Sequence, residues 1–268
     1  MRKIKLIALD IDGTMLTDEG AVTKEVQESI AKATRQGVQV ILCTGRMYRS
    51  AKNFGYLFKD RMPIITYNGA LIRELNDGKT LYHQGLPSSD KLIIFNKLIK
   101  YGLQPNIYTD DALFSIEGNP YIADYAEHTR VPYTLLKTQN IESFLEPREV
   151  TKMVGIGSPE QVNSLLTEEA ALYGDDIYFA KSFDFFLEIG HKDVNKGKAL
   201  EKLGETLGID PSEMMAVGDN LNDAEMLETV GYPVLMGNGI ESLRDKGYFI
   251  TKDNNESGVA YAISQFLF

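Results

Sequence analysis

Hydrophobic positions along the chain alternate between short apolar runs and segments with helical spacing. Residues 4–9 form a nearly continuous apolar run, which is typical of a strand covered on both faces. After Thr23, apolar residues recur at helical spacing until Gly37, which predicts a helix that ends there. Two further apolar runs, residues 38–43 and 63–67, predict buried strands. Strand–helix–strand units of this kind favour a parallel sheet with right-handed crossovers.

The pattern changes in the middle of the chain, from Gly85 to Glu188. Short predicted strands and two longer predicted helices alternate there and are separated by turn residues. The helices are expected at residues 90–101 and 160–173, and the strands at residues 106–108, 152–156 and 183–189. Beyond His191 the first pattern resumes, with helices expected at 196–207 and 224–230 and strands at 214–217 and 233–236. The expected fold is therefore α/β, with a Rossmann-like parallel-sheet core (residues 1–84 and 189–268) and an inserted α+β domain (residues 85–188).

Composition and charge exclude several classes of protein. Of the 268 residues, 43% are hydrophobic and 25% charged, which is typical of a globular protein. The net charge of −10 argues against a nucleic-acid partner, because a phosphate backbone needs clustered Lys and Arg. The apolar runs are far shorter than the ~20 residues that span a bilayer, so no membrane partner is expected. Cys43 is the single cysteine and cannot form an internal disulfide. Because residues 1–3 lead directly into the first strand without a secretory leader, a cytoplasmic location is expected.

Two carboxylates follow the first predicted strand, in the segment Asp10-Ile11-Asp12-Gly13-Thr14. Ligands of parallel sheets bind at the carboxyl ends of the strands, so this is the natural position for a site. Two like charges in one loop repel each other, and a bound cation would neutralise them. Oxygen ligands at a phosphate site indicate Mg²⁺. An Asp-Gly turn that merely leads out of a strand is the alternative.

Three further segments carry polar residues to the ends of predicted elements. Thr44-Gly45-Arg46 ends the second strand, and its hydroxyl and amides could bind a phosphate. Asn195-Lys196-Gly197 opens a helix, where an ammonium group can pair with an anion. The segment 218–223, Gly-Asp-Asn-Leu-Asn-Asp, follows another strand and adds carboxylates. Taken alone, Thr44 could be a helix cap, Lys196 a surface lysine and Asp219-Asn220 a turn, but four such segments in one chain favour a single site.

Together these motifs resemble those of the haloacid dehalogenase superfamily. The resemblance is strongest to the Cof-type sugar-phosphate phosphatases, whose large type IIB cap is inserted between the second and third motifs. It covers the whole chain, and the residues that carry it are Asp10 to Thr14, Thr44 to Arg46, Asn68-Gly69-Ala70, Lys196-Gly197, Gly218 to Asp223 and Ser257 to Ala260.

The resemblance implies a role for each matching residue. Asp10 would be the nucleophile that forms an aspartyl-phosphate, and Asp12 the general acid and then base. Mg²⁺ would be held by the side chains of Asp10 and Asp219 and by the backbone carbonyl of Asp12, with Asp223 supporting these ligands. The backbone of Ile11 and the residues Thr44, Gly45, Lys196 and Asn222 would bind the phosphoryl oxygens. Phosphoryl transfer requires such a nucleophile and concentrated positive charge around the phosphoryl group.

The implied function is a Mg²⁺-dependent phosphatase that hydrolyses a small phosphorylated metabolite, such as a sugar phosphate, a nucleotide or a cofactor phosphate. The large cap implies a small substrate. A sugar phosphomutase or phosphotransferase with the same site is an alternative enzyme, and a non-catalytic phosphate-binding regulator is an alternative of another class. The sequence leaves the physiological substrate and the oligomeric state open. Cys43, within an apolar strand, is expected to be a buried structural thiol.

Overall fold

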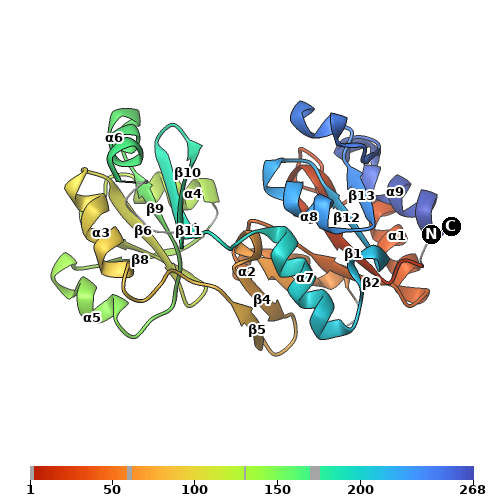
Figure 1. The fold of residues 1–268 in the computed structure, drawn as a ribbon, viewed down its shortest axis with the longest axis horizontal. Coiled ribbons are helices and arrows are strands. Elements are labelled where there is room, and N and C mark those ends of the chain that lie inside the picture. Colours follow the sequence, from red (N-terminus) through yellow and green to blue (C-terminus); the bar gives the residue numbers. More distant parts are fainter. Residues whose placement is uncertain (1–2, 59–61, 130, 170–175) are drawn as a thin grey trace. The chain divides into compact units, whose positions relative to one another are not determined.

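A computed structural model describes residues 3–58, 62–129, 131–169 and 176–268 of the chain. The chain divides into two compact units. The core unit combines residues 1–83 with residues 194–268, and the inserted unit comprises residues 84–193. In Figure 1 the red-orange and blue ends of the chain share the core unit, whereas the yellow and green segments form the inserted unit. The insertion expected at residues 85–188 falls inside this second unit.

The core unit contains a parallel five-stranded sheet in the order β14-β13-β12-β1-β2. Its strands are β1 (Leu6–Leu9), β2 (Gln39–Leu42), β12 (Met214–Gly218), β13 (Tyr232–Leu235) and β14 (Phe249–Ile250). Its helices are α1 (Lys24–Arg35), α2 (Tyr48–Ala51), α7 (Lys196–Leu207), α8 (Ala224–Thr229) and α9 (Gly258–Leu267). All four residues of β1 are buried, as expected for a central strand covered on both faces.

Helices cover both faces of this sheet. Alternate residues of a strand point to opposite faces, and Leu6 and Ala8 share a buried cluster with Leu200 and Leu203 of α7. Figure 1 shows α7 and α8 on this side of the sheet and α1 and α9 on the other. Because β1, β2 and β12 run parallel, their carboxyl ends meet at one edge of the sheet, and three of the four motifs found in the sequence follow these ends.

The strand expected at residues 63–67 is buried but lies in a different sheet. It forms β3 (Pro63–Thr66), which pairs antiparallel with β4 (Leu71–Glu74), and β4 pairs in turn with β5 (Thr80–His83). An isolated parallel bridge, Cys43 to Ile65, links β3 to the end of β2. The chain turns back sharply after Thr66 instead of entering a crossover helix, and this reversal makes the next pairing antiparallel.

The inserted unit contains a mixed six-stranded sheet in the order β10-β11-β9-β6-β7-β8. Its strands are β6 (Gln104–Thr109), β7 (Ala112–Ile116), β8 (Tyr133–Leu136), β9 (Val150–Ile156), β10 (Ile177–Phe183) and β11 (Phe186–His191). Its helices are α3 (Lys91–Lys100), α4 (Ile122–Thr129), α5 (Ile141–Leu145) and α6 (Pro159–Glu169). Side chains of α3, α5 and α6 share a buried cluster with one face of the sheet.

Two elements of the inserted unit differ in extent from those expected from the sequence. The single strand expected at residues 183–189 is wrong, because a turn at Asp184 and Phe185 separates β10 from β11 in a hairpin. The helix expected at residues 160–173 corresponds to α6, and residues 170–173 lie outside the described part of the chain.

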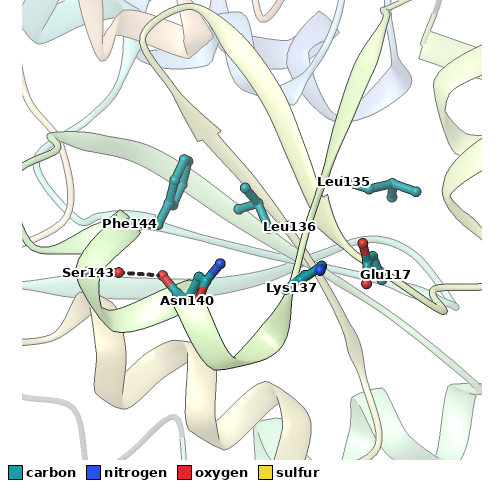
Figure 2. A pocket seen from close by; sticks show the side chains of 7 residues that line it. All are labelled: Glu117, Leu135, Leu136, Lys137, Asn140, Ser143 and Phe144. Atoms are coloured by element: carbon teal, nitrogen blue, oxygen red, sulfur yellow. Dashed lines mark hydrogen bonds between the residues drawn. The ribbon is translucent and has the colours of Figure 1, made fainter.

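A pocket of about 510 Å³ lies in the inserted unit beside the edge strand β8. Figure 2 shows the side chains that line it, which are Glu117, Leu135, Leu136, Lys137, Asn140, Ser143 and Phe144. None of the site residues expected from the sequence lines this pocket. Among the described helices, none combines the length and the apolar character needed to span a lipid bilayer.

Candidate active site

Asp10 lies directly after β1, at the carboxyl edge of the parallel sheet. It is only 5% exposed, and its backbone N–H donates to the carbonyl of Val217 in β12 at 3.1 Å. The chain then forms a tight turn, Ile11–Met15, in which Gly13 has a φ of 74°. A Cβ at Gly13 would lie 2.5 Å from Oδ2 of Asp219. Glycine at this position therefore lets the turn approach the Asp219 carboxylate closely.

Lys196 is completely buried at the first position of α7. Its Nζ lies 2.7 Å from Oδ1 of Asp10 and 2.6 Å from Oδ1 of Asp223. Asn195 caps the helix, because its side chain accepts from the backbone N–H of Lys198. The cap fixes the helix start, and thus the point from which the lysine reaches Asp10. A surface lysine, the alternative considered from the sequence, is excluded.

Asp219 and Asp223 come from the loop after β12. Oδ2 of Asp223 accepts the backbone N–H groups of Asp219 and Asn220 at 3.0 and 3.1 Å, so Asp223 shapes the loop that carries Asp219. Thr14 donates its hydroxyl to Oδ1 of Asp219 at 2.8 Å. Residues after β1, after β12 and at the start of α7 thus meet at one point.

This point carries more negative than positive charge. One oxygen from each of Asp10, Asp219 and Asp223 lies within 4.8 Å of the others, whereas Lys196 is the single ammonium bonded to them within the described residues. Burial raises the pKa of Asp10 to about 8 against the opposing effect of Lys196, and burial likewise raises the pKa of Asp219 to about 6. Burial would lower the pKa of Lys196, but Asp10 and Asp223 outweigh it and raise that pKa.

The excess of negative charge at this point indicates whether the site can accept a metal ion. Burial outweighs the single Lys196 ammonium, so the ionised carboxylates lack part of the positive charge that would compensate them. The available donors are oxygens, which suit a hard divalent ion better than zinc or copper. The residues present therefore fit a divalent cation beside Asp10 and Asp219.

The Thr44-Gly45-Arg46 turn follows β2 at the same edge of the sheet. Thr44 is buried, its N–H donates to the carbonyl of Ile65, and its Oγ1 accepts from the N–H of Arg46. Arg46 extends to Asp12, where its Nε donates to Oδ2 at 2.7 Å and a second guanidinium nitrogen donates to Oδ1. The Asp12 side chain is 59% exposed. Its carboxylate is thus held by Arg46, whereas that of Asp10 is held by Lys196.

Asn222 is exposed, and its Nδ2 donates to Oδ1 of Asn68 at 3.1 Å. The side chain of Ile11 is fully buried, which leaves its backbone as the part available to a ligand. Cys43 is buried, and burial raises the pKa of its thiol, as expected of a structural cysteine. Sequence reasoning assigned no role to Arg46 or Asn68, although both belong to the motifs that carry the resemblance.

A comparison with family models matches residues 7–263 to the haloacid dehalogenase-like hydrolases. The chain belongs to the haloacid dehalogenase-like hydrolase family. This match spans both units, and it includes every residue placed at the candidate site. The family resemblance noted in the sequence is therefore confirmed.

Individual proteins match this haloacid dehalogenase-like chain along nearly its whole length. M6_Spy0533 of Streptococcus pyogenes serotype M6, named as a phosphatase, is 32% identical over 267 residues, or 98% of each chain. YwtE of Bacillus subtilis, named 5-amino-6-(5-phospho-D-ribitylamino)uracil phosphatase, is 30% identical and also covers 98% of each chain. The crystal structure of TM0651 from Thermotoga maritima superposes with a TM-score of 0.90 at 31% identity, covering 99% of this chain and 98% of that one. The chain is thus a hydrolase of the phosphatase type.

Proposed function

We propose that this enzyme hydrolyses the phosphate monoester of a small metabolite through a phosphorylated Asp10. The observation that carries the proposal is the contact between the buried Lys196 ammonium and both Asp10 and Asp223. An aspartate at a strand end, fixed by a buried cation, is a positioned nucleophile. The same cation can balance charge on a phosphoryl group.

Mg²⁺ is the cation that we propose for the charge excess. The side chains of Asp10 and Asp219 and the backbone carbonyl of Asp12 would hold it. Asp223, bonded to Lys196 and to two backbone N–H groups, would support these ligands without binding the ion. When bound, Mg²⁺ neutralises charge on the phosphoryl oxygens and on the attacking carboxylate.

The proposed reaction has two steps. A carboxylate oxygen of Asp10 attacks phosphorus, the bond from phosphorus to the ester oxygen breaks, and Asp12 donates a proton to the departing oxygen. A water molecule then loses a proton to Asp12 and attacks phosphorus. The bond from phosphorus to the Asp10 oxygen breaks, which releases inorganic phosphate and restores both carboxyl groups to their initial states.

Phosphoryl oxygens would be bound by donors at the sheet edge. These are the backbone N–H groups of Ile11 and Gly45, the hydroxyl of Thr44, the ammonium of Lys196 and the side-chain amide of Asn222. They come from four separate segments, so each would contact a different part of the phosphoryl group. Fixed donors of this kind stabilise the charge that develops during phosphoryl transfer.

The substrate class that we propose is a small phosphorylated metabolite, such as a sugar, nucleotide or cofactor phosphate. The name of YwtE supports this class, because its named substrate carries a phosphate ester on a ribityl chain. The net charge of −10 also disfavours a polyanionic macromolecule as substrate.

A trapping experiment tests the proposed intermediate. The enzyme with Mg²⁺ and an activated aryl phosphate is quenched in acid during turnover, and its peptides are analysed by mass spectrometry. We expect one phosphoryl group on the peptide that contains Asp10, removable by hydroxylamine as an acyl phosphate is. Asp10→Asn serves as the control and should carry no label. Turnover that is unchanged by a chelator, or a label on another residue, would contradict the proposal.

A further inference from the structure

Three consecutive residues between β3 and β4 have positive φ angles. They are Tyr67, Asn68 and Gly69, with φ of 53°, 55° and 105°. This left-handed region is unfavourable for residues with a side chain. Asparagine tolerates it better than most residues, but tyrosine does not. Strained backbone of this kind persists only where the surrounding contacts enforce it.

The backbone of this turn is fixed against two segments of the proposed active site. The N–H of Tyr67 donates to the carbonyl of Arg46 at 2.9 Å, and the N–H of Asn68 donates to that of Thr44 at 3.0 Å. On the other side, a Cβ at Gly69 would lie 2.3 Å from the carbonyl oxygen of Asn195. The turn therefore lies in contact with both the Thr44–Arg46 segment and the residue that caps α7.

The side chain of Asn68 reaches two further residues of the proposed site. Its Oδ1 accepts from Nδ2 of Asn222 at 3.1 Å. A Cβ at Gly45 would lie 2.8 Å from the same oxygen. Gly45 thus provides the space that the Asn68 amide occupies.

We infer that Asn68 is a positioning residue, which orients the amide of Asn222 toward the phosphoryl group. This inference rests on the proposed function, because it concerns the same phosphate-binding residues. An exposed asparagine amide rotates and can present either its oxygen or its nitrogen to a ligand. In the observed orientation Asn68 presents Oδ1 to Asn222, and an oxygen accepts only from a donor, so the Asn222 amide is held with its NH₂ group facing Asn68. One N–H then bonds Asn68 and the other remains for a phosphoryl oxygen.

The strained turn follows from the same inference. Oδ1 of Asn68 must contact the backbone of Gly45 and the side chain of Asn222 at the same time. The left-handed backbone conformation at Asn68 places this oxygen between the two residues. In an extended conformation the side chain would leave the turn in another direction. The energetic cost of a left-handed non-glycine residue is small beside the effect of misplacing a group that binds the transition state.

A double-mutant cycle on phosphate affinity tests the inference. Asn68→Gly removes the side chain and suits a positive φ, and Asn222→Ala removes the proposed donor. The dissociation constant of inorganic phosphate is measured by calorimetry with Mg²⁺ present for the wild type, both single variants and the double variant. Asn68→Gly should weaken phosphate binding by about fivefold, as expected for a neutral hydrogen bond. In the Asn222→Ala background, Asn68→Gly should have no further effect, because its action runs through Asn222.

Fully multiplicative losses in the double variant would overturn the inference, because Asn68 would then act independently of Asn222. An unchanged affinity in Asn68→Gly would also overturn it. Asp111→Gly is the matched control, since Asp111 has a φ of 54° in the β6–β7 turn of the inserted unit. The affinity of this variant for phosphate should equal that of the wild type. Thermal unfolding of each variant separates a folding defect from a binding effect. The cycle measures binding, so a failure of the proposed hydrolysis would appear separately as absent turnover.

Discussion

Arg46 binds both carboxylate oxygens of Asp12, although the two residues follow different strands. The guanidinium fork makes two hydrogen bonds to the carboxylate and lies with its Cζ 5.3 Å from the ring centroid of Phe54. Two-point pairing of this kind fixes the direction in which a carboxylate points. Both side chains are partly exposed, so the pair contributes only about 0.2–1 kcal/mol. That is little enough for Asp12 to exchange Arg46 for a substrate oxygen during the reaction.

Arg46→Gln should therefore impair the reaction in proportion to how much the leaving group needs a proton. We expect kcat/KM for an alkyl phosphate to fall by roughly tenfold, because a misdirected acid loses part of its contribution of about 10²–10⁴. For a nitrophenyl phosphate, whose leaving group departs without a proton, the fall should be less than about twofold. Arg49→Gln removes the same charge from α2 and serves as the control. Equal losses for both substrates would mean that Arg46 binds substrate instead of directing Asp12.

Asp10→Asn should abolish turnover and preserve the fold. The side chain keeps its size, and Lys196 retains Asp223 as a charged partner. The attacking oxygen loses its charge, so we expect kcat to fall by at least ~10³, comparable with removal of a nucleophile in other enzymes. Circular dichroism and thermal unfolding report the fold, and aryl phosphate hydrolysis reports the chemistry. A variant with more than a tenth of wild-type activity would remove Asp10 from the nucleophile role.

The sequence predicts the positions of groups that follow regular elements. Lys196 and Asp10 lie 2.7 Å apart although they are far apart in the chain. Asp10 follows a buried strand and Lys196 starts a helix. Hydrophobic patterning alone therefore places both residues at the same edge of the sheet. The charge of each group then indicates the pairing.

Contacts within loops leave no such pattern. The ion pair between Arg46 and Asp12 depends on the rotamers of two side chains in the loops that follow β2 and β1. The left-handed backbone of Tyr67 depends on its contact with the Thr44–Arg46 turn. Asp184 shows a related limit. It lies in the short turn of a hairpin, between Phe183 and Phe185. Because apolar residues flank it on both sides, the hydrophobic pattern predicts one continuous strand instead of two.

Lys196→Met should destabilise the protein, and most strongly when no metal ion is present. The variant leaves Asp10 and Asp223 buried without their ammonium partner, and breaking a buried ion pair costs about 3–5 kcal/mol. Urea unfolding in a chelator should show this loss in the free energy of unfolding. Mg²⁺ should recover part of it by supplying positive charge to the same carboxylates. Lys198→Met, two residues further along α7 and exposed, is the control and should unfold like the wild type in both conditions.

The metal-free protein should lose stability as the pH rises from about 4 to about 8. Burial raises the pKa of Asp10 to about 8 and that of Asp219 to about 6, both above the ordinary value of 3.8. Between the unfolded and folded pKa values the native state binds more protons than the unfolded state, so the free energy of unfolding decreases with rising pH. Below about pH 4 both states are protonated, and these groups contribute no slope.

Mg²⁺ should reverse this trend, because it binds the ionised carboxylates and competes with the protons. Thermal unfolding from pH 5 to pH 8, with a chelator and with excess Mg²⁺, tests the expectation. The midpoint should fall with pH in the chelator, and the increase produced by Mg²⁺ should grow with pH. In Asp219→Asn one of the two titrating groups is absent, so both the slope in the chelator and the Mg²⁺ effect should diminish. A Mg²⁺ effect of the same size at every pH would show that the ion does not bind at Asp10 and Asp219.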